Sequence, residues 1–245
     1  MSQETRKYRN LSLERQGDVF IITLEKPPEN RLNTWYCQEI IRAFNDARRA
    51  LGQGTDGALI MRGSDAKFFC TGLDLHERDS NPYASSEGFY PLIHTILDFP
   101  FPTICLITGH VFGGASVMSL ALDYRIMNSA RGYWCMPAVD LSLHFDGMGT
   151  LIRSKLSPPV ARKVLLEGHK FKSSEALADG IVDELAPPED MFDRALILAN
   201  RVKGKAQMGV YGMLRSELYG DAVKAFQKIS YVHSRVIARE AKVKL

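Results

Sequence analysis

Residues 102–126, PTICLITGHVFGGASVMSLALDYRI, decide the fold. Pro102 to Thr108 is an apolar run with the length and composition of a buried strand. Gly113 and Gly114 then form a turn, and the apolar side chains after them recur at helical spacing up to Asp123. A strand, a glycine-rich turn and a helix in this order are typical of an α/β protein.

Flanking segments repeat the same alternation. Residues 19–24 (VFIITL) and 57–62 (GALIMR) are short β-rich runs and are predicted to be strands. Between them, Asn33 and Thr34 offer a cap for a helix that ends before Gly52. Residues 173–185 predict a helix and a short strand, and the chain from Pro187 onward has a helical pattern.

Composition restricts the class of protein. The chain has 245 residues, 45% of them hydrophobic and 24% charged, as in ordinary folded proteins. The 31 basic and 28 acidic residues are interspersed, which does not suggest a nucleic-acid partner. Residues 99–122 carry no formal charge, but prolines and glycines interrupt them, so we expect a buried strand and helix rather than a membrane span.

Metal, nucleotide and disulfide chemistry have little support. The four cysteines form no CxxC pair and are too sparse for a disulfide framework, which favours a reducing compartment. The six histidines show no metal-ligand spacing, and no phosphate-binding or zinc-protease motif occurs, so we expect neither a metal nor a cofactor. The first ten residues are polar and show no cleavable signal.

Two glycine turns are the strongest functional candidates. Gly72 follows the apolar segment Phe68–Cys70, and Gly113–Gly114 opens the predicted buried helix. The first N–H groups of a helix lack intrahelical partners and lie at its positive end. Two turns of this kind can together supply the backbone donors of an oxyanion hole, although each could also be only a tight turn.

These turns, about forty residues apart, resemble those of the crotonase (enoyl-CoA hydratase/isomerase) superfamily. KFFCTGLDL (67–75) resembles its first oxyanion segment, and residues 102–126 resemble its second. The opening strand and proline-rich turn at residues 19–33, the Met136–Leu141 segment and residues 171–185 also correspond in order. The resemblance implies an α/β spiral of ββα units over residues 1–185 and a C-terminal helical region, 186–245, for capping or trimerisation.

The resemblance also implies a site. Its oxyanion donors would be the backbone N–H groups of Leu73 and Gly114, and its substrate an acyl-CoA thioester, with coenzyme A as part of the substrate rather than a cofactor. The substrate-binding residues implied in this way are Cys70, Gly72, Leu73, Gly113, Gly114 and Phe145.

The carboxylates depart from the hydratase pattern. Where crotonase hydratases carry two glutamates, this chain has Val117 and Ala138. Asp146 precedes Gly147 as the catalytic glutamate of peroxisomal Δ3,Δ2-enoyl-CoA isomerases precedes a comparable glycine. Moving a double bond requires one base that takes a proton at C2 and returns it at C4, so one carboxylate suffices. We therefore expect an enoyl-CoA isomerase of fatty acid metabolism with Asp146 as its base.

Other interpretations stay open. The chain could be a hydratase or catalyse another crotonase reaction, or it could bind acyl-CoA without turnover. Asp146 could be only a turn or helix-cap residue, and Asp140, His110 and His144 are weaker candidate bases. A serine hydrolase on the same architecture would need a nucleophile such as Ser116 or Ser119.

Assembly and location are expectations from the same resemblance. Related proteins form trimers or dimers of trimers, and basic residues of the C-terminal region, such as Lys224, Arg235 and Arg239, could reach the CoA phosphates. The C-terminal residues Lys244 and Leu245 match the end of a peroxisomal signal, whereas Val243 does not. We expect a peroxisomal protein, with the cytoplasm as the alternative.

Overall fold

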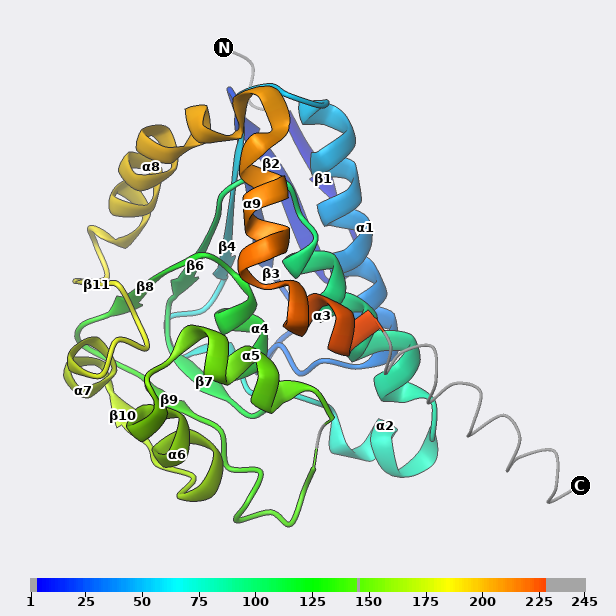
Figure 1. Cartoon of the computed structure of the whole chain (residues 1–245), viewed down its shortest axis with the longest axis vertical. Helices are drawn as coiled ribbons and strands as arrows, with labels where there is room; N and C mark the ends of the chain where they lie inside the picture. The colour runs from blue at the N-terminus through cyan, green and yellow to red at the C-terminus, as the bar shows by residue number, and fades with distance from the viewer. Residues whose placement is uncertain (1–3, 145, 228–245) are drawn as a thin grey trace, which may run out of the picture.

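The computed structural model describes residues 4–144 and 146–227. Two β-sheets are surrounded by helices, as the sequence predicted for an α/β chain (Figure 1). The larger sheet has seven strands in the order β1-β2-β3-β4-β6-β8-β11, and the smaller has four in the order β10-β9-β7-β5. From β3 to β11, neighbouring strands of the larger sheet are parallel.

The chain winds between the two sheets as a spiral. After β4 in the larger sheet it enters β5 in the smaller, and the pairs β6–β7 and β8–β9 repeat this step before the helices α4 and α5. The strands of the larger sheet are Glu4–Lys7 (β1), Leu11–Gln16 (β2), Val19–Leu24 (β3), Ala58–Gly63 (β4), Thr103–Ile107 (β6), Tyr124–Asn128 (β8) and Glu184–Ala186 (β11). Those of the smaller sheet are Phe68–Cys70 (β5), His110–Phe112 (β7), Tyr133–Cys135 (β9) and Phe171–Lys172 (β10).

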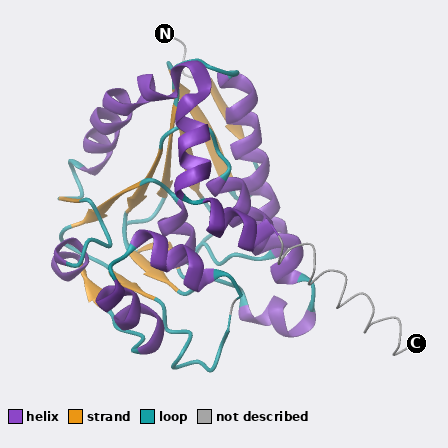
Figure 2. Ribbon diagram, in the orientation of Figure 1, coloured by secondary structure: helices purple, strands orange, loops and turns teal. Residues whose placement is uncertain are grey.

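Helices cover both faces of the larger sheet (Figure 2). They are Thr34–Leu51 (α1), Leu75–Ser80 (α2), Tyr90–Leu97 (α3), Gly114–Ala121 (α4), Met148–Lys155 (α5), Pro158–Leu166 (α6), Ser173–Ala178 (α7), Met191–Val202 (α8) and Val210–Leu218 (α9). A π-helical turn, Ser85–Phe89 (η1), precedes α3, and a 3-10 segment, Lys203–Gly209 (η2), precedes α9.

Both faces of β3 are buried, which explains its uninterrupted apolar sequence. Phe20 and Ile22 belong to the core cluster that includes α1 and α3, whereas Val19 and Ile21 belong to the cluster that includes α8. Parallel strands that are covered on both faces read as continuous apolar runs. The strand is thus fixed in a three-layer arrangement of helix, sheet and helix.

Local signals set the ends of α1 as predicted. The Asn33 side chain accepts a hydrogen bond from the Tyr36 N–H at 2.9 Å, and Gly52 ends the helix with φ +80°. This is the pairing of a polar N-cap with a C-terminal glycine that the sequence indicated.

The described part of the C-terminal region, residues 187–227, is mainly helical, with a break that the pattern did not reveal. Gln207 has an extended ψ of 139° and Met208 has φ +68°, so the chain turns between α8 and α9. In Figure 1, α9 lies over the centre of the molecule and α8 to its left. Within the described residues no helix is both long and apolar enough to cross a membrane.

Candidate functional site

The segment that contains Gly72 is held by the turn at residues 26–32. Asn30 is 3% exposed, and its side chain accepts from the Lys26 N–H at 2.8 Å and donates to the Phe69 carbonyl at 2.9 Å. The Thr71 N–H also donates to the Glu29 carbonyl at 3.1 Å. The asparagine-containing turn therefore fixes the chain that follows β5.

A parallel bridge then orients Leu73. The Leu32 N–H donates to the Gly72 carbonyl, and the Leu32 carbonyl accepts from the Asp74 N–H, both at 2.8 Å. Successive peptide groups of an extended chain point to opposite sides, so the Leu73 N–H is directed away from Leu32. Among the described residues it donates to no protein acceptor.

The second turn meets the first at Gly72. A Cβ placed on Gly72 would lie 2.6 Å from the Phe112 carbonyl oxygen and 3.0 Å from the Gly114 nitrogen, and the residue has φ +92°. Only glycine meets both demands. Gly113, with φ +57°, turns the chain into α4, whose first residue is Gly114. Within the described residues the Gly114 N–H, like that of Leu73, has no protein acceptor.

A cavity of about 320 Å³ opens beside these two turns. Its wall is mainly apolar, with a polar stretch from the 26–32 turn. The lining residues are Glu29, Arg31, Phe68, Thr71, Leu73, Leu75, Phe112, Gly113, Gly114, Met136, Pro137, Ala138, Leu141 and Leu143. Such a cavity suits a ligand with an apolar tail and one polar group placed against the backbone donors.

Glu29 is the carboxylate among the described residues that line the cavity, and no sequence pattern predicted its place there. Its Oε2 accepts from the Arg31 Nε at 2.7 Å and from the Thr71 Oγ1 at 3.0 Å. The hydrogen bond from Arg31, and to a smaller degree that from Thr71, holds the Glu29 pKa below its usual value. A carboxylate stabilised in this way is a weak base.

Val117 and Ala138, which the resemblance matched to the two hydratase glutamates, carry no carboxylate. Ala138 lines the cavity, and Val117 is buried within α4 at 1% exposure. Neither position can activate a water molecule or move a proton.

Asp146 is not among the described residues that line the cavity, and its link to the site runs through its neighbours. It immediately precedes Gly147, the N-cap of α5, and α5 packs against α4. Asp146 interacts with the buried Tyr90, whose neighbour Phe89 would lie 3.2 Å from a Cβ on Gly114. The Asp146 side chain is 38% exposed, and its Oδ1 is 3.7 Å from His144 Nδ1.

The other predicted substrate-binding residues differ in their placement. Gly113 lines the cavity, whereas Cys70 is fully buried behind it and its Sγ donates to the Asn30 carbonyl. Phe145 lies outside the described residues. The exposed Asp140 packs against Gly168, and a Cβ placed on Gly168 would lie 2.6 Å from Asp140 Oδ2.

His110 lies in an aromatic stack beneath the cavity wall. Its ring is nearly parallel to those of Phe112 and Tyr133, with centroids 5.5 and 5.7 Å away. The Tyr133 N–H donates to His110 Nδ1 at 3.2 Å. Burial, aided by Arg131 and Lys67, lowers the His110 pKa. The histidine therefore joins β7 to β9 in its neutral form.

The buried serines of α4 are used structurally. Ser116 Oγ donates to the Cys135 carbonyl at 2.6 Å, and Ser119 Oγ donates to the Ser116 carbonyl and accepts from Trp134 Nε1. Both serines are 0% exposed, which argues against either as a nucleophile. Within the described residues no group of three or more His, Cys, Asp or Glu side chains could hold a metal ion.

Comparison with known proteins adds independent information. The sequence profile of the family described as "Enoyl-CoA hydratase/isomerase" matches residues 14–240. "Enoyl-CoA delta isomerase 2, peroxisomal" of Arabidopsis thaliana is 31% identical over 222 residues, covering 85% of this chain and 91% of that protein. "Carnitinyl-CoA dehydratase" of Proteus mirabilis is 26% identical, covering 86% of this chain and 80% of that protein.

A solved structure confirms the expected fold. The crystal structure of an enoyl-CoA hydratase from Mycobacterium marinum superimposes with a TM-score of 0.83 and 20% sequence identity. The match covers 92% of this chain and 98% of that one.

Proposed function

Because the chain belongs to the enoyl-CoA hydratase/isomerase family, we propose that it is a Δ3,Δ2-enoyl-CoA isomerase acting through an enolate held by backbone donors. One observation carries the proposal: two backbone N–H groups without protein acceptors, those of Leu73 and Gly114, meet beside an apolar cavity that lacks both hydratase carboxylates. The similarity to a plant enoyl-CoA delta isomerase supports it.

In the proposed reaction the thioester carbonyl oxygen accepts hydrogen bonds from the Leu73 and Gly114 N–H groups. The carboxylate of Asp146 removes a proton from C2 of the 3-enoyl thioester, and the electron pair moves into the carbonyl to form a dienolate. The same carboxyl group then returns the proton to C4, and the double bond comes to lie between C2 and C3. Donors that are already in place stabilise the oxyanion without reorganisation.

Asp146 is the better proposal for the base than Glu29. Arg31 and Thr71 occupy one carboxylate oxygen of Glu29 and lower its pKa, which weakens it as a proton acceptor. Asp146 directly precedes the N-cap of α5 and interacts with Tyr90, the first residue of α3. We assign Glu29 to the wall of the cavity and Asp146 to the proton transfer.

The test is conversion of 3-enoyl-CoA to 2-trans-enoyl-CoA by the purified protein, with hydration of 2-enoyl-CoA assayed in parallel. We expect isomerisation without hydration, and a loss of about 10²-fold in kcat for Asp146→Ala, as for removal of a general base. Glu29→Gln is the matched control and should keep kcat within a few fold.

Three results would change the proposal. Full activity of Asp146→Ala with loss in Glu29→Gln would transfer the base to Glu29. Hydration as the main reaction would make the chain a hydratase. Binding of acyl-CoA with neither reaction would indicate a binding protein.

We also propose assembly through the C-terminal helices. Met213, Leu214 and Leu218 are 60–68% exposed on α9, at spacings that place them on one side of the helix. Such an apolar face is typical of a subunit interface. A homotrimer, or a dimer of trimers, would cover it, and sedimentation equilibrium measures the mass directly.

The peroxisome is the proposed location, as the label of the Arabidopsis relative indicates for that protein. The terminal residues Val243, Lys244 and Leu245, like Arg235 and Arg239, lie outside the described residues. Lys224, which belongs to the described residues, is exposed and lines a polar groove between α5 and the segment after α9. Fluorescence microscopy of the tagged protein with and without Lys244–Leu245 tests the location.

A further inference from the structure

Three helices of equal length run from the site to a common point. α3, α4 and α5 each contain eight residues, which corresponds to about 12 Å. Gly114 begins α4, Phe89 immediately before α3 packs on Gly114, and Gly147 next to Asp146 caps α5. The N-terminal ends of all three helices therefore face the candidate site.

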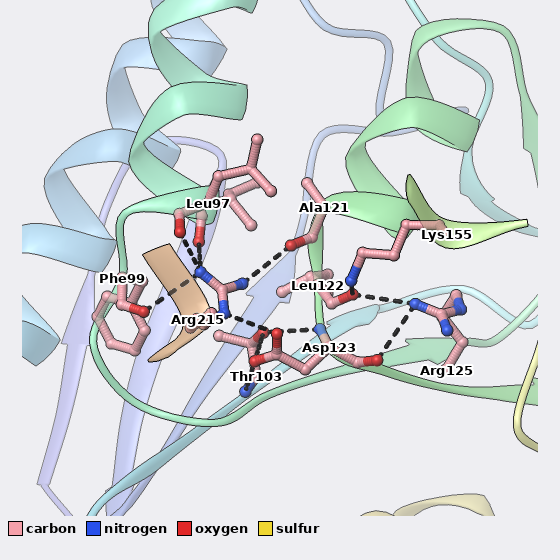
Figure 3. Close-up of polar contacts among 10 residues, drawn as sticks. Leu97, Phe99, Thr103, Ala121, Leu122, Asp123, Arg125, Lys155 and Arg215 are labelled. Carbon is pink, nitrogen blue, oxygen red and sulfur yellow. Dashed lines mark hydrogen bonds and ion pairs between the residues drawn. The ribbon is translucent and has the colours of Figure 1, made fainter. Parts of the chain in front are cut away.

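Arg215 of α9 binds the opposite ends of α3 and α4 (Figure 3). Its Nη1 donates to the carbonyls of Ile96, Leu97 and Phe99 at the end of α3, and its Nη2 donates to the Ala121 carbonyl, the last residue of α4, at 3.0 Å. The residue is 4% exposed. One guanidinium thus joins the C-terminal ends of two helices.

Two further basic side chains donate hydrogen bonds at the end of α4. Arg125 Nη1 of β8 donates to the Leu122 carbonyl at 3.0 Å, and Lys155 Nζ, from the last residue of α5, donates to the same oxygen at 3.2 Å. Lys155 Nζ also lies 3.8 Å from the centre of the Tyr219 ring. The ends of α3, α4 and α5 therefore meet in one cluster, which we call the helix-end cluster and define as Asp123, Arg125, Lys155 and Arg215.

Asp123 supplies the opposing charge. Its Oδ1 accepts from Arg215 Nε at 2.6 Å, and its Oδ2 accepts from the N–H and the hydroxyl of Thr103. Burial alone would raise the Asp123 pKa, but Arg215 and Lys155 outweigh it and the pKa is lowered. The carboxylate is thus ionised, and both of its oxygens are used.

This arrangement fixes the axial position of α4. All eight residues of α4 are buried. Water therefore cannot replace the hydrogen bonds to the carbonyls at its end if their partners are removed. Cations at a helix C-terminus are also electrostatically favourable. A helix this short moves as one unit, so a shift at Ala121 is transmitted to the Gly114 N–H at its other end.

We infer that Arg215 is a positioning residue for the thioester site, holding α4 so that the Gly114 N–H meets the substrate carbonyl. The inference rests on the proposed function, because it assumes that this N–H binds the thioester oxygen. Arg215 lies about 12 Å from that atom along α4 and does not touch the substrate.

The experiment compares the wild type with Arg215→Lys, which keeps the charge but cannot donate to both helix ends. Arg62→Lys is the matched control, because Arg62 is a partly buried arginine that binds Thr23 and stacks on Phe192 of α8, away from α4. All three proteins are studied below their melting temperatures. The probe is hexanoyl-CoA labelled with ¹³C at the thioester carbonyl, whose infrared band reports polarisation without turnover.

We expect the bound carbonyl band of the wild type to move to lower frequency and that of Arg215→Lys to move less than half as far. The kcat for isomerisation should fall about 10-fold in Arg215→Lys with KM unchanged, since a displaced donor weakens the transition state more than binding. Arg62→Lys should match the wild type in both measurements.

Two results would overturn the inference alone: an unchanged band and kcat in Arg215→Lys, or equal losses in Arg62→Lys, which would indicate general destabilisation. A wild-type band that moves without any isomerisation would refute the proposed reaction and leave the positioning role intact. A wild-type band that does not move would refute the oxyanion site, and the inference with it.

Discussion

The two ends of α4 differ in how their backbone groups are used. At the first residue, the Gly114 N–H faces an apolar cavity and has no acceptor among the described residues. At the other end, the carbonyls of Ala121 and Leu122 accept hydrogen bonds from Arg215, Arg125 and Lys155. The N-terminal end of α4, where a ligand is expected, thus has an N–H group without a protein acceptor. The carbonyls at its C-terminal end have protein donors, which hold the helix in place.

Removing Arg215 should have the largest effect on this contrast. Arg215→Met leaves the Asp123 carboxylate buried without its partner, which should lower the free energy of unfolding by about 3–5 kcal/mol. Urea denaturation measures the change. In the double variant Arg215→Met with Asp123→Asn we expect a smaller loss, and an equal loss would show that the helix carbonyls, rather than the charge, dominate.

Removing the donor at the other end should affect catalysis rather than stability. Gly114→Pro deletes one N–H at the first position of a helix, where proline is tolerated. We expect kcat for isomerisation to fall about 10² to 10³-fold, as for loss of an oxyanion donor. Gly114→Ala retains the N–H and is the control, and similar losses in the two variants would attribute the effect to packing against Leu73 and Phe89.

A third prediction concerns pH. Burial, with Arg125 and Arg215 nearby, lowers the Lys155 pKa to about 7, below its value in the unfolded chain. The unfolded chain therefore binds more protons between about pH 7 and pH 10.5, so this residue makes the protein more stable as pH rises through that window. The slope contributed is at most about 1.4 kcal/mol per pH unit.

Urea midpoints of the wild type and of Lys155→Met are measured at pH 7, 8 and 9. The difference between the two proteins isolates the contribution of Lys155 to the pH dependence, because other titrating groups are common to both. We expect the wild type to gain stability relative to the variant as pH rises. Parallel curves would show that Lys155 titrates normally.

The smallest effect should come from an exposed cation at the same end of α3. Arg48 pairs with Asp98 at 3.3 Å, with the two side chains 49% and 46% exposed. Arg48→Gln should change the free energy of unfolding by about 0.5 kcal/mol or less, because solvent screens exposed pairs. A loss near that of Arg215→Met would contradict the distinction between buried and exposed cations.

Sequence patterns predicted those strands and helices whose formation depends mainly on their own residues. Residues 19–24 and 57–62 form β3 and β4 to within a residue, because continuous apolar runs are what doubly covered parallel strands require. The short strands of the smaller sheet, such as His110–Phe112 and Tyr133–Cys135, were not identified separately. Three-residue strands are stabilised by their neighbours rather than by their own sequence.

The site divides in the same way. Gly72 and Gly113 were found because their positive φ angles favour glycine, whereas Glu29 was missed because only tertiary pairing of its turn with Thr71 brings it to the cavity. The helix-end cluster was not predicted, because nothing in the sequence around Arg215 distinguishes it from an exposed arginine on a helix. The sequence feature that could have revealed this cluster is Asp123, the first charged residue after the uncharged stretch 99–122. A carboxylate next to such an apolar stretch requires a buried partner, which is Arg215.

Main-chain donors, as proposed at Leu73 and Gly114, affect how this chain can diverge. Apart from proline, no amino-acid replacement at either position deletes the N–H itself, so the proposed activation of a carbonyl is largely insulated from mutation. The proposed proton-transferring carboxylate of Asp146 has no such protection, because any replacement of the side chain removes it. Reaction type can therefore drift across generations while the ligand class stays constant.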